Sequence, residues 1–300
     1  MIRSSFVVAS AAALAVAASA HAGYIADYNL VVLGNHSITS EVEGRTYVGG
    51  ILSGSGTFAT KLTPASSYLT TDTLVVGGSI NVSQINLNSG NLLRTGSRVG
   101  GVNFNGGGHE TVNGSALAAL SAVSSELNGA SSFLHSMASN SSVTLPTSQP
   151  APATFNAVSG PGGVAVFDIS GSLFSNGLVQ SISLNTNGAT KFVINVSGTS
   201  INYNTGSFTG TWLTPAVRAN AIWNFYEATS ITLDRNFNGA VLAPLAHLTN
   251  TTSIDGSVFV GSFTQNGEVH LPNYIGVPAP AAASLFGLGA VAFGRRRRAA

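Results

Sequence analysis

The sequence contains no cysteine and very little charge. The absence of cysteine among its 300 residues excludes disulfides, thiolate metal sites and cysteine nucleophiles. Charged residues make up 8% of the chain, against about 25% in typical soluble proteins. The surface must therefore be polar through amides and hydroxyls, while an apolar content of 44% is enough to bury a core.

A basic surface is also missing once the chain ends are set aside. The formal charge is +1, but five of the 12 basic residues lie near the termini: Arg3, Arg295, Arg296, Arg297 and Arg298. The other seven basic residues are outnumbered by 11 acids, which gives the body of the chain a net charge of −4. Because nucleic-acid binding requires a basic patch or stripe, no nucleic-acid partner is expected.

The N-terminal segment, residues 1–22, has the layout of a secretory signal peptide. Arg3 supplies the charged start, an apolar run follows from Phe6 to Ala18, and Ala20 and Ala22 form an A-x-A cleavage site. We expect cleavage between Ala22 and Gly23, which leaves a secreted bacterial protein.

The C-terminal segment, residues 277–300, has the layout of a sorting tail. The small and apolar residues from Ala281 to Gly294 make a helix of about 21 Å, shorter than a stable membrane span. The order Val277, Pro278, x, Pro280, short apolar run, then Arg295 to Arg298 resembles the PEP-CTERM signal of Gram-negative bacteria. The resemblance implies transient membrane attachment through the tail alone and cleavage by an exosortase-type peptidase. Delivery to the cell surface or matrix would follow, although Ala279 replaces the usual glutamate of that motif.

The body, residues 23–276, is predicted to be mainly β. Short β-branched runs such as "TLVVGGSINV" and "KFVINVSG" alternate with Gly, Asn and Ser. The triplet Val-Gly-Gly recurs at positions 48–50, 76–78 and 99–101. Repeats at intervals of about 20 to 50 residues favour a β-solenoid, whose corners use Gly, Asn and Ser. A β-sandwich of the same composition is the alternative.

One segment, residues 114–140, is predicted to be a long helix flanking the strands. Its apolar residues recur at spacings of three and four and form one stripe: Leu120, Val123, Leu127, Ala130, Leu134 and Met137. Asn113 or Ser115 is suited to cap the start, and Gly129 predicts a bend or split. The proline-containing stretch 141–156 is expected to return to the sheet as an extended loop.

Two blocks of the body resemble the choice-of-anchor A domain, a secreted bacterial module. They are Asp27–Gly50, and Val193–Gly198 with Ile222–His270. The matching positions are Glu43, Gly44, Arg45, Gly49, Gly50, Trp223, Asn224, Phe225, Tyr226, Pro244 and His270. The resemblance implies a β-helical adhesive domain without catalytic residues. From the residues themselves, Glu43 and Arg45 are expected to pair, and the aromatics to lie in the core.

No catalytic, cofactor or metal motif is present in the sequence. The pair His109–Glu110 is not followed by a second histidine in H-E-x-x-H spacing, and no G-x-S-x-G elbow or G-K-[ST] loop occurs. The acids available for polysaccharide cleavage are Asp168, Glu227, Asp234, Asp255 and Glu268, and their spacing forms no motif. Asp234 and Asp255 are better suited to capping turns. We therefore expect no enzyme, cofactor or metal site.

Three functions fit these features. The first is adhesion, by a secreted surface or biofilm-matrix protein that contacts an extracellular polysaccharide or cell-surface ligand. The second is a polysaccharide-active β-helix enzyme using some of the five acids. The third is an ice-binding solenoid, which needs a regular threonine array; the sequence has only isolated clusters, at Leu69–Thr73 and Leu248–Ser253.

Overall fold

The computed structural model describes residues 23–276. The predicted signal cleavage at Ala20 and Ala22 and the sorting motif from Val277 to Arg298 therefore lie outside the described residues, apart from Gly23. Within residues 23–276 no helix is long and apolar enough to cross a bilayer.

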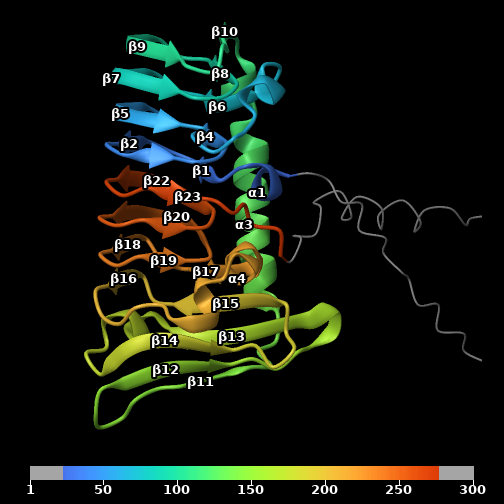
Figure 1. Ribbon diagram of the computed structural model, residues 1–300, viewed down its shortest axis with the longest axis vertical. Helices are drawn as coiled ribbons and strands as arrows, with labels where there is room; N and C mark the ends of the chain where they lie inside the picture. Colours follow the sequence, from blue (N-terminus) through green and yellow to red (C-terminus); the bar gives the residue numbers. More distant parts are fainter. Residues whose placement is uncertain (1–22, 277–300) are drawn as a thin grey trace, which may run out of the picture.

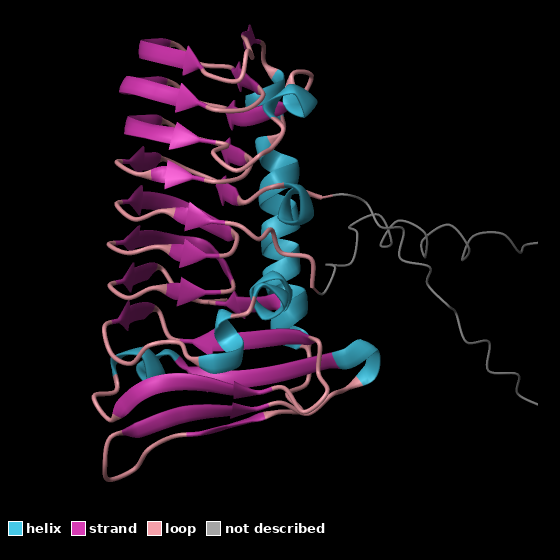
Figure 2. Ribbon diagram, viewed as in Figure 1, coloured by secondary structure: helices cyan, strands magenta, loops and turns pink. Residues whose placement is uncertain are grey.

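The strands form three parallel columns, each built by stacking one strand segment per layer (Figures 1 and 2). Column A runs through β13 (Val164–Ser170), β15 (Lys191–Ser197), β17 (Ala221–Asn224), the start of β20 (Ala240–Asn250), the start of β22 (Val258–Gln265), β1 (Leu30–Val32), β4 (Thr46–Val48), β6 (Asp72–Val76), β8 (Asn91–Arg94) and β10 (Glu110–Val112). Column B runs through β16 (Ser200–Tyr203), β18 (Ser230–Leu233), the ends of β20 and β22, β2 (His36–Ile38), and the starts of β5 (Leu52–Phe58), β7 (Ile80–Leu87) and β9 (Arg98–Phe104). Column C runs through β19 (Phe237–Asn238), β21 (Ile254–Asp255), β23 (Val269–His270), β3 (Glu41–Val42) and the ends of β5, β7 and β9.

The chain visits the layers out of sequence order. Residues 28–112 build the upper layers of Figure 1, helix α3 carries the chain to the opposite end, and residues 164–270 build upward again. The two series meet in the middle, where β22 pairs with β1 and β23 pairs with β3. Strands from opposite ends of the described chain therefore share one sheet.

The prediction of a mainly β chain with one long helix is confirmed. Every pairing in the large sheet is parallel, unlike the antiparallel sheets of a typical β-sandwich. A second, smaller sheet of β11 (Ser142–Thr144), β12 (Ala151–Asn156) and β14 (Val179–Asn185) closes the lower end. The expected extended loop at 141–156 thus contributes two strands, joined by residues 145–150.

Only two of the three Val-Gly-Gly triplets occupy equivalent positions in successive layers. Val48 pairs with Val76 in column A, so the first two triplets are equivalent. The residue stacked on Val76 is Arg94, whereas Val99 of the third triplet lies in column B beside Asn81 and is 66% exposed. The prediction was wrong for the third triplet because the layers differ in length, so the layer from Val76 to Arg94 is shorter than the layer from Val48 to Val76.

Helix α3 (Leu120–Ser136) packs along column A and covers its outer side. The predicted stripe is confirmed: its four central residues are buried, and Leu120 and Met137 are partly buried against the same cluster. The predicted break at Gly129 was wrong, because the helix passes through it and the interruption falls at Ala119, after α2 (Ser115–Ala118). Neither Asn113 nor Ser115 is the N-cap: this position of α2 is Gly114, without a side-chain cap. Asn113 Oδ1 accepts a hydrogen bond from the amide of Ser115, the first residue of α2.

Column A is mostly apolar on both sides because it lies between two cores. One set of its side chains points to the interior of the stack and the other packs under α3, as expected for a parallel sheet covered by a helix. The interior core of the lower layers is strongly aromatic: Phe155, Phe174, Phe208, Trp212, Trp223 and Phe237 lie in mutual contact. The remaining short helices are α1 (Tyr24–Asp27), α4 (Pro215–Asn220), η1 (Ala65–Tyr68), η2 (Pro161–Gly163), η3 (Gly171–Ser175) and η4 (Gly210–Leu213).

A buried polar ladder fixes α3 on column A. Asn224 lies next to Asn195 in register, and its Nδ2 donates to Asn195 Oδ1 at 2.9 Å and to the carbonyl of Ser131 at 2.9 Å. Ser131 Oγ donates back to Asn224 Oδ1 at 2.7 Å. Asn195 Nδ2 reaches the carbonyl of Leu134 at 3.0 Å and Asp168 Oδ1 at 3.1 Å. Because these bonds are directional, they set the position of the helix along the sheet, which apolar packing alone specifies weakly.

Candidate binding face

The outer side of column B carries an unbroken row of small polar side chains. In register from the lower layers upward, the row contains Asn202, Thr232, Thr249, Thr264, Ser37, Ser53 and Asn81. We call this set the hydroxyl row. With neighbouring strands about 4.8 Å apart, its seven members span about 29 Å.

The residues between these positions explain why the row is straight. Each strand of column B alternates, with side chains such as Ile231, Leu248 and Phe263 buried inside and the hydroxyl row outside. A register slip of one residue would bury the row and expose the core side chains, so the register is strongly specified. The resulting surface is a sheet face opposite the helix (Figure 1).

A second row runs beside the first, two residues earlier along each strand. It contains Ser200, Ser230, His247 and Ser262 in register. His247 links the rows: its Nδ1 lies 2.8 Å from Ser262 Oγ, and its Nε2 lies 3.2 Å from Thr264 Oγ1. Neither row contains Asp, Glu, Lys or Arg, so this face offers hydrogen bonds without a fixed charge.

The threonine array therefore differs from the sequence expectation. Thr249 of the Leu248–Ser253 cluster lies between Thr232 and Thr264, which come from other segments. In contrast, the Leu69–Thr73 cluster contributes nothing to this face: Thr73 is buried and bonds the carbonyl of Ser89. The threonines of this array come from different layers, so threonines that are close together in the sequence do not predict it.

The five acids considered for catalysis are distributed along the stack. Asp168 accepts from Asn195, Glu227 Oε1 accepts from the amide of Gly198 at 2.6 Å, and Asp234 Oδ1 accepts from Thr251 Oγ1 at 3.2 Å. Only Asp255 and Glu268 come together, on column C. The expected turn-capping by Asp234 and Asp255 was wrong, because their carboxylates bond side chains of other layers and segments.

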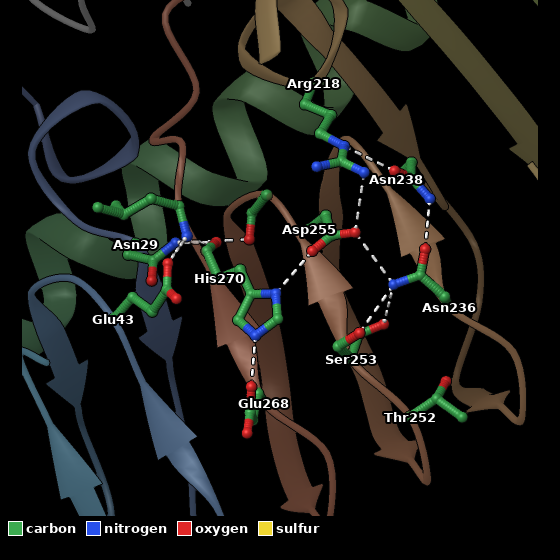
Figure 3. Close-up of polar contacts among 12 residues, drawn as sticks. Asn29, Glu43, Arg218, Asn236, Asn238, Thr252, Ser253, Asp255, Glu268 and His270 are labelled. Carbon is green, nitrogen blue, oxygen red and sulfur yellow. Dashed lines mark hydrogen bonds and ion pairs between the residues drawn. The ribbon is translucent and has the colours of Figure 1, made fainter. Parts of the chain in front are cut away.

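Asp255 is the centre of a polar network (Figure 3). Its Oδ2 lies 3.1 Å from an Arg218 guanidinium nitrogen and accepts from Asn236 Nδ2 at 3.1 Å. Its Oδ1 lies 2.7 Å from His270 Nδ1, and His270 Nε2 lies 2.5 Å from Glu268 Oε2. Burial acts to lower the pKa of His270, but the hydrogen bonds to Glu268 and Asp255 outweigh it and raise the pKa.

This network holds two chain segments together. Both ring nitrogens of His270 face carboxylates, which favours the protonated form of the imidazole. Immediately beside it, Asn29 Nδ2 donates to the carbonyl of His270 at 3.0 Å, and Glu43 Oε2 accepts from the amide of Leu271 at 2.8 Å. These bonds join the first and last layers of the chain where the two series meet.

The sequence motifs fall mainly in the core and at this junction. Trp223 and Phe225 are fully buried, as expected, and Pro244 is buried within β20. Tyr226 is half-buried and stacks on His135, with ring centroids 3.8 Å apart. Gly44, Gly49 and Gly50 lie where layers approach closely; a Cβ at Gly50 would come within 2.6 Å of the backbone of Gly34.

The expected pairing of Glu43 with Arg45 was wrong. The two side chains have different partners: Glu43 bonds the amide of Leu271, whereas Arg45 bonds Tyr28 Oη and the carbonyl of Asp72, each at 3.2 Å. The Arg45 guanidinium also lies over the Tyr28 ring, 4.3 Å from its centroid, a cation–π contact. Arg45 thus ties the first layer to the entrance of β6.

Comparison with known families matches almost all of this body. Residues 21–271 fit the family described as "Putative Ice-binding-like adhesive domain". The chain belongs to this family. The matched range contains the whole hydroxyl row, the polar network and helix α3, so the adhesive domain coincides with the stack of parallel strands. Membership of this family fits a binding role.

Solved structures with a remote likeness to the adhesive domain include two ice-binding proteins. One comes from the Antarctic ascomycete Antarctomyces psychrotrophicus, with 11% identity, a TM-score of 0.31, and 84% of this chain and 97% of that chain covered. The other is a glycosylated ice-binding protein from an Arctic yeast, with 15% identity, a TM-score of 0.35, and coverage of 85% and 95%. Scores this low establish neither a shared fold nor a shared function. No curated protein sequence matches the chain.

Proposed function

We propose that the chain is a secreted bacterial adhesin whose β-solenoid binds an extracellular polysaccharide or cell-surface ligand through the hydroxyl row. The observation that carries the proposal is the row itself: seven side chains in register, all hydroxyl or amide, on an uncharged sheet face. Such a face can match the closely spaced hydroxyls of a polymer by many weak hydrogen bonds. Binding by repetition suits adhesion, because individually weak contacts add along an extended surface.

The position of the chain ends supports display of this face. In Figure 1 both ends of the described chain lie on the helix side, opposite column B. We propose that signal-peptide cleavage and a PEP-CTERM-type tail, acted on by an exosortase-type peptidase, deliver this choice-of-anchor A domain to the surface or matrix of a Gram-negative bacterium. Attachment on the helix side would leave the hydroxyl row directed outward.

The test replaces two central members of the row. In Thr249→Lys/Thr264→Lys protein, two long charged side chains prevent flat contact, and we expect retention on insoluble polysaccharides and on cells of the producing strain to fall at least tenfold. The matched control, Ser121→Lys/Ser125→Lys, adds the same charge on the exposed side of α3 and should bind like the wild type. Equal binding by both variants, or unchanged attachment and biofilm formation after gene deletion, contradicts the proposal.

Ice binding is the second candidate. It is favoured by Thr232, Thr249 and Thr264, which are neighbours on three adjacent strands of the hydroxyl row. It requires retention in a growing ice front that the same Thr249→Lys/Thr264→Lys substitution abolishes. Ice retention without polysaccharide or cell binding would replace adhesion by this function. Polysaccharide cleavage is the third candidate; turnover by the purified protein that Glu227→Gln or Asp234→Asn abolishes would establish it instead.

A further inference from the structure

The described chain begins directly beside a carboxylate on α3. Glu126 lies in the middle of the helix, and its two oxygens accept backbone hydrogen bonds from Tyr24 at 3.1 Å and Ile25 at 3.0 Å. A Cβ built on Gly23 would lie 2.5 Å from Glu126 Oε1 and 2.9 Å from Cδ. A side chain at position 23 would therefore clash with the Glu126 carboxylate, and glycine avoids this clash.

The same geometry brings the nitrogen of Gly23 close to Glu126. The amide nitrogen and a Cβ are both bonded to Cα and lie about 2.5 Å apart. A nitrogen so placed lies no more than about 5 Å from Oε1, a range at which opposite charges at a protein surface attract each other.

The carboxylate of Glu126 has no cationic partner in residues 23–276. None of the ion pairs there includes it, and α3 contains neither Lys nor Arg. The side chain is half-buried. A partly buried carboxylate with two amide donors gains further stability from a positive charge at contact distance.

We propose that removal of residues 1–22 creates that charge, and that the α-ammonium of Gly23 then forms an ion pair with Glu126. Hydrolysis of the Ala22–Gly23 peptide bond frees the Gly23 amine, which is protonated at neutral pH. The pair fastens the start of the mature chain to the middle of α3. Before cleavage the same nitrogen is a neutral amide and cannot form it, so processing itself stabilises the mature fold. The inference rests on the predicted cleavage site and is independent of what the hydroxyl row binds.

Two preparations of the chain from Gly23 to Ala300, identical except for Nα-acetylation, test the pair. Acetylation removes the charge and leaves the backbone donor in place. For a partly exposed ion pair in a domain of this size, we expect the free amine to raise Tm by about 2 °C. In the Glu126→Gln variant, whose neutral amide can accept a hydrogen bond but cannot form an ion pair, acetylation should change Tm by much less.

The comparison within each variant isolates the pair from any general effect of the substitution. An acetylation effect of equal size in the wild type and in Glu126→Gln would overturn the proposal, as would no effect in the wild type. Sequencing the N-terminus of the protein recovered from its native host is the second measurement. A mature chain that begins at a residue other than Gly23 overturns it as well, whatever the result of the adhesion assays.

Discussion

The sharpest prediction concerns the buried ladder that positions α3. Asn224 is fully buried, and the substitution Asn224→Leu removes its three side-chain hydrogen bonds. Two side-chain groups then lose a partner, Ser131 Oγ and Asn195 Oδ1, in residues that are themselves buried. At about 1–3 kcal/mol for each unsatisfied group, the free energy of unfolding should fall by about 2–6 kcal/mol, a large part of the roughly 5–15 kcal/mol typical of a domain.

Urea unfolding followed by tryptophan fluorescence measures this loss, because Trp212 and Trp223 are buried in the interior core. The single substitution Ser131→Ala should cost less, since it leaves only Asn224 Oδ1 without that donor. In the double variant the two costs should not add, with a coupling energy of about 0.5–3 kcal/mol. The exposed Asn103→Leu is the matched control and should stay within about 0.5 kcal/mol of the wild type. A loss for Asn224→Leu no larger than that of an ordinary surface substitution, or strictly additive costs, would refute the assignment of the ladder.

Three further predictions concern titration and backbone strain. His36 is fully buried against Phe263; burial lowers its pKa from 6.5 to about 4, with the Gln265 hydrogen bond opposing. Because only the unfolded state binds a proton between pH 6.5 and pH 4, the contribution of His36 to the free energy of unfolding should be complete above pH 6.5 and about 2 kcal/mol smaller at pH 5. Urea midpoints at pH 7.5 and pH 5 that differ by the same amount in the wild type and in His36→Phe would contradict this. His270 has a raised pKa, so its contribution should be present below pH 6.5 and be lost as pH rises through the raised value; an NMR titration midpoint below 6.5 would contradict it. Gly54 has a φ of 97°, and a Cβ there would lie 2.1 Å from the carbonyl oxygen of Ile38, whereas Gly129 in α3 faces open space; Gly54→Ala should therefore cost about 2 kcal/mol or more, and Gly129→Ala should add about 0.5–1 kcal/mol, both read from urea midpoints.

What the sequence predicted well depends on contacts between residues close together in the chain. The stripe from Leu120 to Met137 predicted the helix and its buried side because helical spacing is local. The mainly β character followed from short β-branched runs for the same reason. The third Val-Gly-Gly triplet misled because layer lengths vary, so an equal motif need not occupy an equal place in the stack.

The binding face and the polar ladder could not be predicted, because their members meet only through the stacking order. Thr264 is next to Ser37 on the surface although the two come from opposite ends of the described chain. One signal was present and unused: Asn195 and Asn224 each interrupt an apolar run, in "FVINV" and "AIWNF". An amide within a strand buried on both sides requires a partner, and the facing helix is the nearest source of one.

The meeting of the two series of layers in the middle of the stack has a consequence for how the chain acquires its shape. Strand β1, near the start of the described chain, can pair with its lower neighbour β22 only after residues 258–260 have been synthesised. Contacts of such long sequence separation slow folding, and during synthesis or export the upper layers would present an open strand edge until the C-terminal strands arrive. Removing β22 and β23 would therefore leave an unpaired edge at the centre of the molecule rather than a shorter stack.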